Sequence, residues 1–297
     1  MAMAGATGLA EPRILRGVML VMAAVLAFAF ADVLTKHLTT AYAVALVVAG
    51  RYIINLGLLG ALYAPRHGAA IWQTQRTGLV ILRGSCLTLA SLTMGLALRT
   101  MPLGETITII YLSPFAVMLL AGPVLGEKVS VAGWIGALIA FAGVVLILRP
   151  GGHLDPVGVA LSLVNAGLAT GYSLLTRVLA RTETMMAMLL YTALVGVVVF
   201  VGLLAFTGIG TLPGLVDSGL IVLLGGLATL GHFLFTAAYR EAPASVLAPV
   251  NYFHLVWGAI LGWLVFDHLP DRISLFGMGL VVLAGMAVAV QARWARG

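Results

Sequence analysis

The sequence predicts an all-α integral membrane protein with ten transmembrane helices, arranged as two five-helix repeats of inverted topology. Three observations carry this prediction: an apolar composition, ten apolar segments of membrane-spanning length, and a polar pattern that occurs twice. Of the 297 residues, 62% are hydrophobic and 9% are charged. Soluble chains carry about 25% charged residues, so this chain cannot cover itself with a polar surface.

The formal net charge of +6 does not indicate a nucleic-acid-binding protein. The basic residues lie mainly in short connections and at the chain ends, which is their usual distribution in membrane proteins. The single cysteine, Cys86, lies in an apolar segment, so a disulfide framework and a cysteine-based metal site are excluded within one chain. We expect Cys86 to be a buried, inert thiol, and we expect no metal and no cofactor.

Ten apolar segments each approach the roughly 20 residues needed to cross the hydrocarbon core. Turn or charge signals mark nearly every boundary between them. The first segment also resembles a secretory signal, but its counterpart in the second half leads us to expect a retained helix. The connections are too short to fold as a soluble domain. The segments are 17–36, 42–63, 79–98, 104–124, 130–149, 157–178, 184–207, 215–238, 244–265 and 273–292.

A stripe of small and polar residues runs along the third segment and recurs along the eighth. The spacing i, i+4, i+7, i+11 places each stripe on one face of a helix. Equivalent positions differ by a constant 141 (225 − 84, 229 − 88), which indicates a duplication. We therefore predict one repeat over 1–151 and a second over 152–297. The stripes are Gly84, Thr88, Ser91 and Gly95, and Gly225, Thr229, His232 and Thr236.

Each predicted repeat has five helices, an odd number, so the second repeat must enter the membrane upside down relative to the first. Inverted repeats are the architecture of many secondary transporters, which bind substrate near the midplane at the repeat interface. A duplication retained for stability alone is the alternative. Eleven Lys and Arg residues, Arg83 among them, fall on the side of the termini and four on the other. This bias predicts that both termini are cytoplasmic. We expect the membrane to be a bacterial-type inner (plasma) membrane.

Short motifs near the helix ends carry a resemblance to a known family. In the first half they are Phe28–Lys36, Met101–Glu105, Ser113-Pro114, Leu125–Glu127 and Leu148–Gly151, and in the second Ala242–Ser245, Ala248–Tyr252 and Phe266-Asp267. With these motifs the chain resembles the EamA-type drug/metabolite transporters, in two copies that cover nearly all of it. The family usually has Glu where Asp267 stands, a change that keeps the charge.

The resemblance implies coupled or facilitated movement of small metabolites, often amino acids leaving the cell, and the chain is similar to the aromatic amino-acid exporters. We accordingly predict an amino-acid transporter that works by alternating access, without catalytic residues, as a monomer in the lipid bilayer. The alternatives are an exporter or importer of cationic metabolites or drugs, such as S-adenosylmethionine-like compounds, and an integral membrane enzyme. An enzyme would need convergent polar groups, whereas His67, Asp155, Glu183 and Asp217 are scattered over different connections.

Eight polar or aromatic residues are candidates for the wall of a substrate cavity. An unpaired polar group facing lipid costs several kcal/mol, so such residues should face protein or water. Aromatic rings from the fourth and ninth segments would suit flat apolar side chains of the substrate. Ordinary helix packing explains the same residue types equally well. The candidates are Thr88, Ser91, Tyr111, Thr229, His232, Asn251, Tyr252 and Trp257.

Few charges lie within the predicted helices. Asp32 and Lys36 are spaced i, i+4, and we expect them to pair with each other. Arg51 lies well inside the second segment, where a cation needs a partner. A proton-coupled cycle would have to use Asp32 or His232, and uncoupled transport is equally compatible with the sequence. We expect bulky substitutions at Thr88 or Thr229 to impair transport more than at Val144, which we place against lipid.

Overall fold

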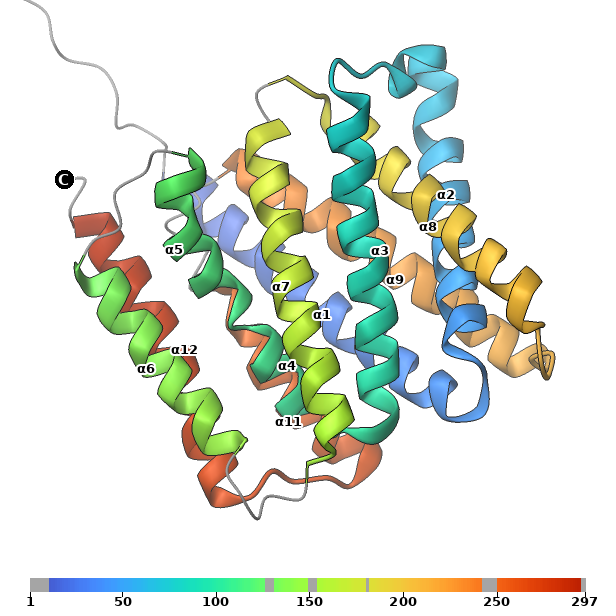
Figure 1. The fold of residues 1–297 in the computed structure, drawn as a ribbon. Coiled ribbons are helices and arrows are strands. Elements are labelled where there is room, and N and C mark those ends of the chain that lie inside the picture. The colour runs from blue at the N-terminus through green and yellow to red at the C-terminus, as the bar shows by residue number, and fades with distance from the viewer. Residues whose placement is uncertain (1–10, 126–130, 149–153, 180–181, 242–249, 295–297) are drawn as a thin grey trace, which may run out of the picture.

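The computed structural model describes residues 11–125, 131–148, 154–179, 182–241 and 250–294, and over these ranges its regular structure is helical (Figure 1). The first half comprises α1 (Glu11–Ala41), α2 (Val44–His67), the 3₁₀ turn η1 (Gly68–Trp72), α3 (Thr77–Thr100), α4 (Leu103–Ile110), α5 (Ser113–Leu125) and α6 (Val131–Ile147). The second half comprises α7 (Pro156–Leu179), α8 (Met185–Thr207), α9 (Leu215–Glu241), α11 (Phe253–Phe266) and α12 (Arg272–Trp294).

Length and composition confirm a multi-pass membrane protein. Among the described residues, six helices are long and apolar enough to cross a membrane: α1, α2, α3, α7, α8 and α9. Four shorter apolar stretches accompany them, at 103–117, 134–147, 253–266 and 272–287.

The fourth predicted segment is not one helix. The structure divides 104–124 into α4 and α5, with a turn at Tyr111 and Leu112. Pro114 is the second residue of α5, where its missing N–H is tolerated, whereas further inside a helix it would remove a backbone hydrogen bond. In the ninth predicted segment, 244–265, α11 begins at Phe253, and 244–249 lie outside the described residues.

Helices of the two halves pack against each other in matching pairs. The first predicted segment packs on the eighth (α1 on α9), and correspondingly the sixth packs on the third (α7 on α3). Likewise α2 packs on α8 and α6 on α12, at opposite edges of the bundle (Figure 1). The main buried cluster contains residues of both halves, such as Ala29, Leu103, Tyr252 and Val281. The two halves therefore share one core.

The edge pair α6 and α12 meets at two glycines. A Cβ atom on Gly143 would lie 2.6 Å from the carbonyl oxygen of Gly277, and one on Gly277 would lie 2.5 Å from that of Gly143. Only glycine allows two helix backbones to approach this closely, a common device in membrane bundles.

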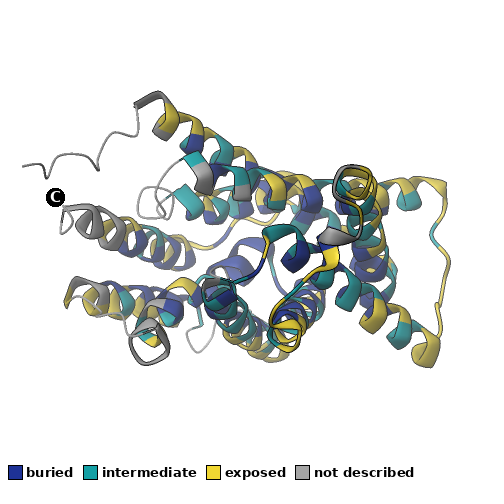
Figure 2. Cartoon of the chain, turned by 90° about the horizontal axis from the view of Figure 1, so that it is seen from above, coloured by how far each residue is buried: buried dark blue, intermediate teal, exposed yellow. Residues whose placement is uncertain are grey.

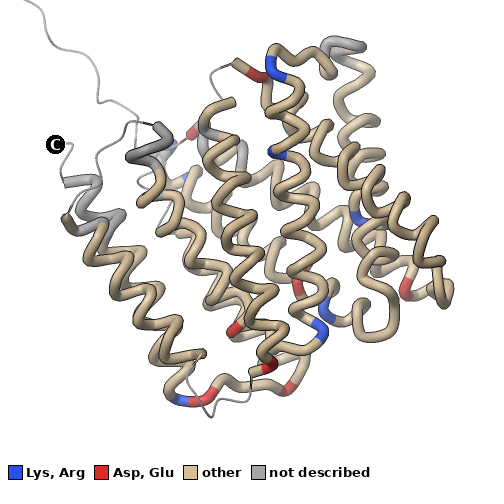
Figure 3. The backbone as a smooth tube through the Cα atoms, viewed as in Figure 1, with Lys and Arg blue, Asp and Glu red and all other residues tan. Residues whose placement is uncertain are grey.

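Burial and charge follow the bundle geometry. Buried positions face the inside of the bundle, and exposed ones face outward (Figure 2). Large apolar side chains occupy much of this outer surface, among them Leu138 and Phe141. Charged residues gather mainly toward the two ends (Figure 3). The expectation that Val144 faces lipid is wrong: it is 1% exposed, because this side of α6 packs on α12, whereas its neighbour Val145 is exposed.

Candidate functional site

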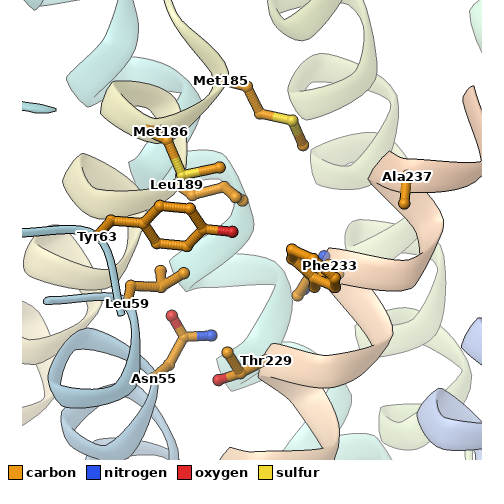
Figure 4. Close-up of a pocket in the computed structure, with 10 residues that line it drawn as sticks. Asn55, Leu59, Tyr63, Met185, Met186, Leu189, Thr229, Phe233 and Ala237 are labelled. Atoms are coloured by element: carbon orange, nitrogen blue, oxygen red, sulfur yellow. The ribbon is translucent and has the colours of Figure 1, made fainter. Parts of the chain in front are cut away.

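A cavity of about 340 Å³ lies between α2, α8 and α9, so both halves of the chain form its wall (Figure 4). Asn55, Leu59 and Tyr63 follow one another at i, i+4 and i+8, which puts them on one face of α2. The wall is largely apolar, with a few polar groups directed inward. Its residues are Asn55, Leu59, Tyr63, Met185, Met186, Leu189, Thr229, His232, Phe233 and Ala237.

A smaller pocket shares Asn55, Leu189 and His232 with this cavity and extends it toward Arg51. Arg51 Nη2 donates a hydrogen bond to Ser91 Oγ at 3.0 Å. Its guanidinium lies 4.9 Å from the ring centroid of Tyr52, and the Tyr52 hydroxyl is 2.9 Å from the same Ser91 oxygen. Among the described residues, the partners of Arg51 are therefore neutral, although a cation inside a membrane helix usually has an opposite charge beside it.

A second arginine, Arg83, is enclosed next to this pocket and is 3% exposed. Its Nε donates to Thr176 Oγ1 at 2.7 Å, and its Nη2 donates to the Tyr172 hydroxyl at 2.7 Å. Its Nη1 donates to Thr192 Oγ1 and to the carbonyl oxygen of Met188. The charge count places Arg83 on the side of the termini, and the structure shows that it does not lie free in a connection, because α7 and α8 cover it.

Phe28 of α1 separates the cavity from an aromatic cluster. Its ring centroid lies 4.9 Å from that of His232, in the cavity wall, and 6.4 Å from that of His254, in the cluster. Within the cluster, the rings of Tyr111 and Tyr252 have centroids 5.5 Å apart. These two tyrosines are equivalent in the two repeats, since 252 − 111 = 141.

The polar groups of this cluster join α1, α11 and the turn between α4 and α5. The Tyr111 hydroxyl donates to the carbonyl oxygen of Asn251 at 3.0 Å and lies 3.2 Å from His254 Nδ1. His254 Nε2 is 3.1 Å from Asp32 Oδ2, which is ion-pairing distance without the alignment of a hydrogen bond.

The predicted pair of Asp32 with Lys36 is wrong. Lys36 Nζ instead donates to the carbonyl oxygens of Leu98 (3.1 Å) and Met101 (2.5 Å). The last carbonyl groups of a helix have no partner within the helix and carry partial negative charge, so the end of α3 attracts the lysine.

The eight candidate residues fall into separate places. Thr229 and His232 line the cavity, and Ser91 holds Arg51 at its inner end. Thr88 is buried, and its hydroxyl has no hydrogen-bond partner among the described residues. Tyr111, Asn251 and Tyr252 belong to the aromatic cluster, and Trp257 packs beside it.

Sequence reasoning left several cavity residues out of its candidates, chiefly Arg51, Asn55 and Tyr63 on α2. Their common helix face, with a cation and an amide four residues apart in an apolar segment, is a signal that would have indicated them.

The acidic residues of the connections serve the fold rather than a catalytic site. Asp155 accepts from the backbone N–H of Gly158, Glu183 accepts from those of Gln75 and Arg76, and Asp217 accepts from the Tyr42 hydroxyl. In the part of the chain that the structure describes, no three His, Cys, Asp or Glu residues group as metal ligands would.

Comparisons with known proteins agree on one family. Residues 15–149 and 156–290 each match the EamA-like transporter family. A pseudopaline exporter of Pseudomonas aeruginosa is 25% identical over 274 residues, which cover 92% of this chain and 95% of the exporter. An S-adenosylmethionine uptake transporter of Rickettsia bellii is 26% identical over 223 residues, 75% of this chain and 76% of the transporter. A solved structure with 18% identity covers 95% of this chain at a TM-score of 0.68 and has the same fold.

Proposed function

Because the chain belongs to the EamA-like transporter family, we propose that it moves amino acids with aromatic or other apolar side chains across the bacterial inner membrane. The protein is a membrane transporter of small metabolites and not an enzyme. The observation that supports a substrate site is the cavity, which is lined by α2 of the first half and by α8 and α9 of the second.

The proposed mechanism is alternating access between two inverted five-helix repeats, over 1–151 and 152–297, that together cross the membrane ten times. The matching pairs of helices support it, because α1 on α9 and α7 on α3 are the same contact made by opposite halves. Exchange of conformation between the halves would then open one site to either side of the membrane.

The position of the cavity supports an inward-facing state. Leu59 and Tyr63 lie in the second half of α2, Met185 is the first residue of α8, and Ala237 lies near the end of α9. All four are near the bundle end that carries the connections from α2 to α3 and from α7 to α8. The excess of Lys and Arg supports a cytoplasmic position for this end. On the other side of Phe28, the packed cluster of Tyr111, Tyr252 and His254 closes the path.

The wall composition supports a small amphipathic substrate. At about 340 Å³ the cavity is at the lower end of the 300–1,000 Å³ range of ligand pockets. Leu59, Met185, Met186 and Phe233 offer apolar surface, and methionine adapts to varied shapes. The other predicted site residues, Tyr111, Asn251, Tyr252 and Trp257, would line the site in the outward-facing state.

A second candidate substrate class is cationic metabolites. The similarity to the S-adenosylmethionine transporter favours it. The two classes differ in the charge that the cavity must hold.

Uptake by proteoliposomes tests the proposed function. Purified protein in liposomes is offered labelled phenylalanine, leucine or S-adenosylmethionine, with and without a pH gradient. We expect saturable phenylalanine and leucine flux. Amino-acid flux equal to that of empty vesicles would refute the amino-acid class, and S-adenosylmethionine flux alone would establish the second candidate.

Substitution of Thr229 tests the site. The Thr229 hydroxyl donates to Gly225 of its own helix at 2.8 Å, so Thr229→Leu loses no bond between helices but fills the cavity. We expect at least about a tenfold loss of transport, equivalent to 1.4 kcal/mol. Val222→Leu, at an exposed position of α9, is the matched control. Equal effects of the two substitutions would show that Thr229 serves packing alone.

A further inference from the structure

The end of the cavity that is lined by Arg51 carries positive charge without a carboxylate to balance it. Arg51 lines this end, and Arg83 lies next to it, joined to the lining residue Thr192. Among the described residues, no carboxylate oxygen lies within 4.0 Å of either guanidinium. An uncompensated cation within a membrane bundle is costly, and such residues commonly mark the path of a substrate or ion.

The acidic residues around the bundle contact partners other than Arg51 and Arg83. Asp32 pairs with His254, and Glu105 lies 3.2 Å from His268. Glu183 binds backbone N–H groups before α3, and Asp217 accepts from Tyr42. Glu241 lies 3.7 Å from Arg16. None of these five lines either pocket.

The two arginines differ in how far their donors are used. A guanidinium has five N–H donors. Arg83 uses four of these donors in hydrogen bonds and is 3% exposed, so it is a structural cation with nearly all of its donors used. The hydrogen bonds of Arg51 to described residues reach Ser91 alone, and the residue is only partly buried. Arg51 therefore offers free N–H donors to the cavity.

We propose that Arg51 binds a carboxylate of the substrate, and that the protein selects substrates with a carboxylate over those with net positive charge. This inference rests on the proposed transport function and specifies its substrate class. A planar guanidinium can donate two parallel hydrogen bonds to a carboxylate, and charge-assisted bonds of this kind are about twice as strong as neutral ones. The apolar body of the substrate extends from Arg51 between Leu189 and Phe233.

The same charge disfavours a cationic substrate. A cation in the cavity would face Arg51 and lie near Arg83 without a carboxylate in the described wall to balance it. Juxtaposed like charges are a recognised means of rejecting a wrong ligand. An amino acid satisfies the site through its carboxylate, and its ammonium finds neutral acceptors such as Asn55 and Thr229.

Binding of probes that share one phenyl ring tests the charge preference. Full-length protein in nanodiscs is titrated calorimetrically with 3-phenylpropionate, phenylalanine, 3-phenylpropanol and 2-phenylethylamine. We expect both carboxylates to bind, and the amine to bind at least about tenfold more weakly than 3-phenylpropionate.

Substitution of Arg51 tests the residue. Arg51→Gln should weaken 3-phenylpropionate by at least about tenfold and leave the neutral 3-phenylpropanol unchanged. Arg51→Lys keeps the charge but loses the paired donors, so it should bind 3-phenylpropionate with intermediate affinity, and it serves if Arg51→Gln does not fold. Arg99→Gln removes the same charge from the exposed end of α3 and should match the native protein.

In the binding experiments, three results would overturn the proposal: native protein that binds the amine as tightly as 3-phenylpropionate, native protein that binds no carboxylate, or unchanged 3-phenylpropionate affinity in both Arg51 variants. Failure of the transport function is distinguishable from these. If carboxylates bind in a way that depends on Arg51 but no amino-acid flux is measured, amino-acid transport is refuted and the binding site at Arg51 is supported. Amino-acid flux that is unchanged in Arg51→Gln would keep transport and refute the site.

Discussion

Arg83 illustrates how one side chain holds three helices together. It extends from α3 to Tyr172 and Thr176 on α7 and to Thr192 on α8, and its guanidinium lies 4.3 Å from the Tyr172 ring centroid. All of these partners are neutral, so the stabilisation comes from charge–dipole hydrogen bonds and from the aromatic face rather than from an ion pair.

Replacement of this guanidinium should be costly even when the charge is kept. Arg83→Lys retains a cation but cannot reach groups in three directions, so we expect a loss of about 2–4 kcal/mol in stability. Thermal unfolding in detergent measures it. Arg272→Lys, at the exposed start of α12, is the control and should be near neutral. A melting temperature of Arg83→Lys equal to that of the control would show that the network adds little.

For single residues, the sequence predicted which helix face a side chain occupies better than it predicted which other side chains it contacts. The stripe spacing correctly placed Thr229 and His232 on one face of α9, because helical periodicity is local information. The partners of Asp32 and Lys36 are on other helices, 222 residues on (254 − 32) and 62 or 65 residues on, so no local rule could find them. Counting Lys and Arg by position likewise could not tell that Arg83 is covered by helices of the other half.

The ends of the helices are fixed by short polar motifs. Asp155 precedes α7 and accepts from the N–H of Gly158 at 2.7 Å and from the Thr100 hydroxyl at 2.9 Å. Asp271 similarly accepts from the N–H groups of Ile273 and Ser274 at the start of α12. At the end of α11, Asp267 adopts a left-handed conformation with φ of 52°. These are ordinary helix-capping devices.

The cap at Asp155 should make stability depend on pH. The backbone N–H of Gly158 and the hydroxyl of Thr100 hold the pKa of Asp155 below its usual value of 3.8. A depressed pKa means that the stabilisation is present at neutral pH and is lost as the pH falls through the folded-state pKa. Asp155→Ala should therefore lower the melting temperature at pH 7, with a difference that shrinks below pH 4.

A non-titrating cap is the control for that experiment. Asn caps helices about as well as Asp, so the difference between Asp155→Asn and Asp155→Ala should not fall in acid. A difference between native protein and Asp155→Ala that is constant from pH 7 to below pH 4 would contradict a role for the ionised carboxylate.

The sequence predicted where the helices lie, but it did not predict where a helix is interrupted. The turn signals placed the sixth helix at 157–178, close to the observed Pro156–Leu179. The division at Tyr111 could not be derived from hydropathy, because one apolar stretch, 103–117, runs across it, although Pro114 indicated a disturbance there.

For the whole molecule, the 141-residue repeat organises which helices meet. A duplication predicts equivalent contacts, and the pairs α1 with α9 and α7 with α3 are such a set. It could not predict that these pairs cross between halves, because a repeat pattern contains no information on which surfaces join. For the same reason the sequence could not predict that α2 and α8 complete the cavity wall around Thr229 and His232.

The proposed orientation of the bundle leads to a labelling prediction. In a variant with Cys86→Ser, single cysteines are placed at the exposed positions Arg76, before α3, and Arg99, near its end. We expect a membrane-impermeant maleimide to label Arg99→Cys in intact cells and Arg76→Cys only after permeabilisation. The reverse pattern would place the termini outside, and labelling of both in intact cells would contradict a membrane-spanning α3.

The enclosure of Arg83 also bears on how the chain enters the membrane during synthesis. Its hydrogen-bond partners follow it by 89 to 109 residues, so α3 is made well before α7 and α8. An arginine at the centre of an isolated helix opposes insertion by about 2.5–3.5 kcal/mol, and less toward a helix end, where it can reach the interface. Until the second half emerges from the ribosome, we therefore expect α3 to hold Arg83 near the headgroups. On this expectation, burial of the arginine is a late step that makes assembly of the first half dependent on completion of the second.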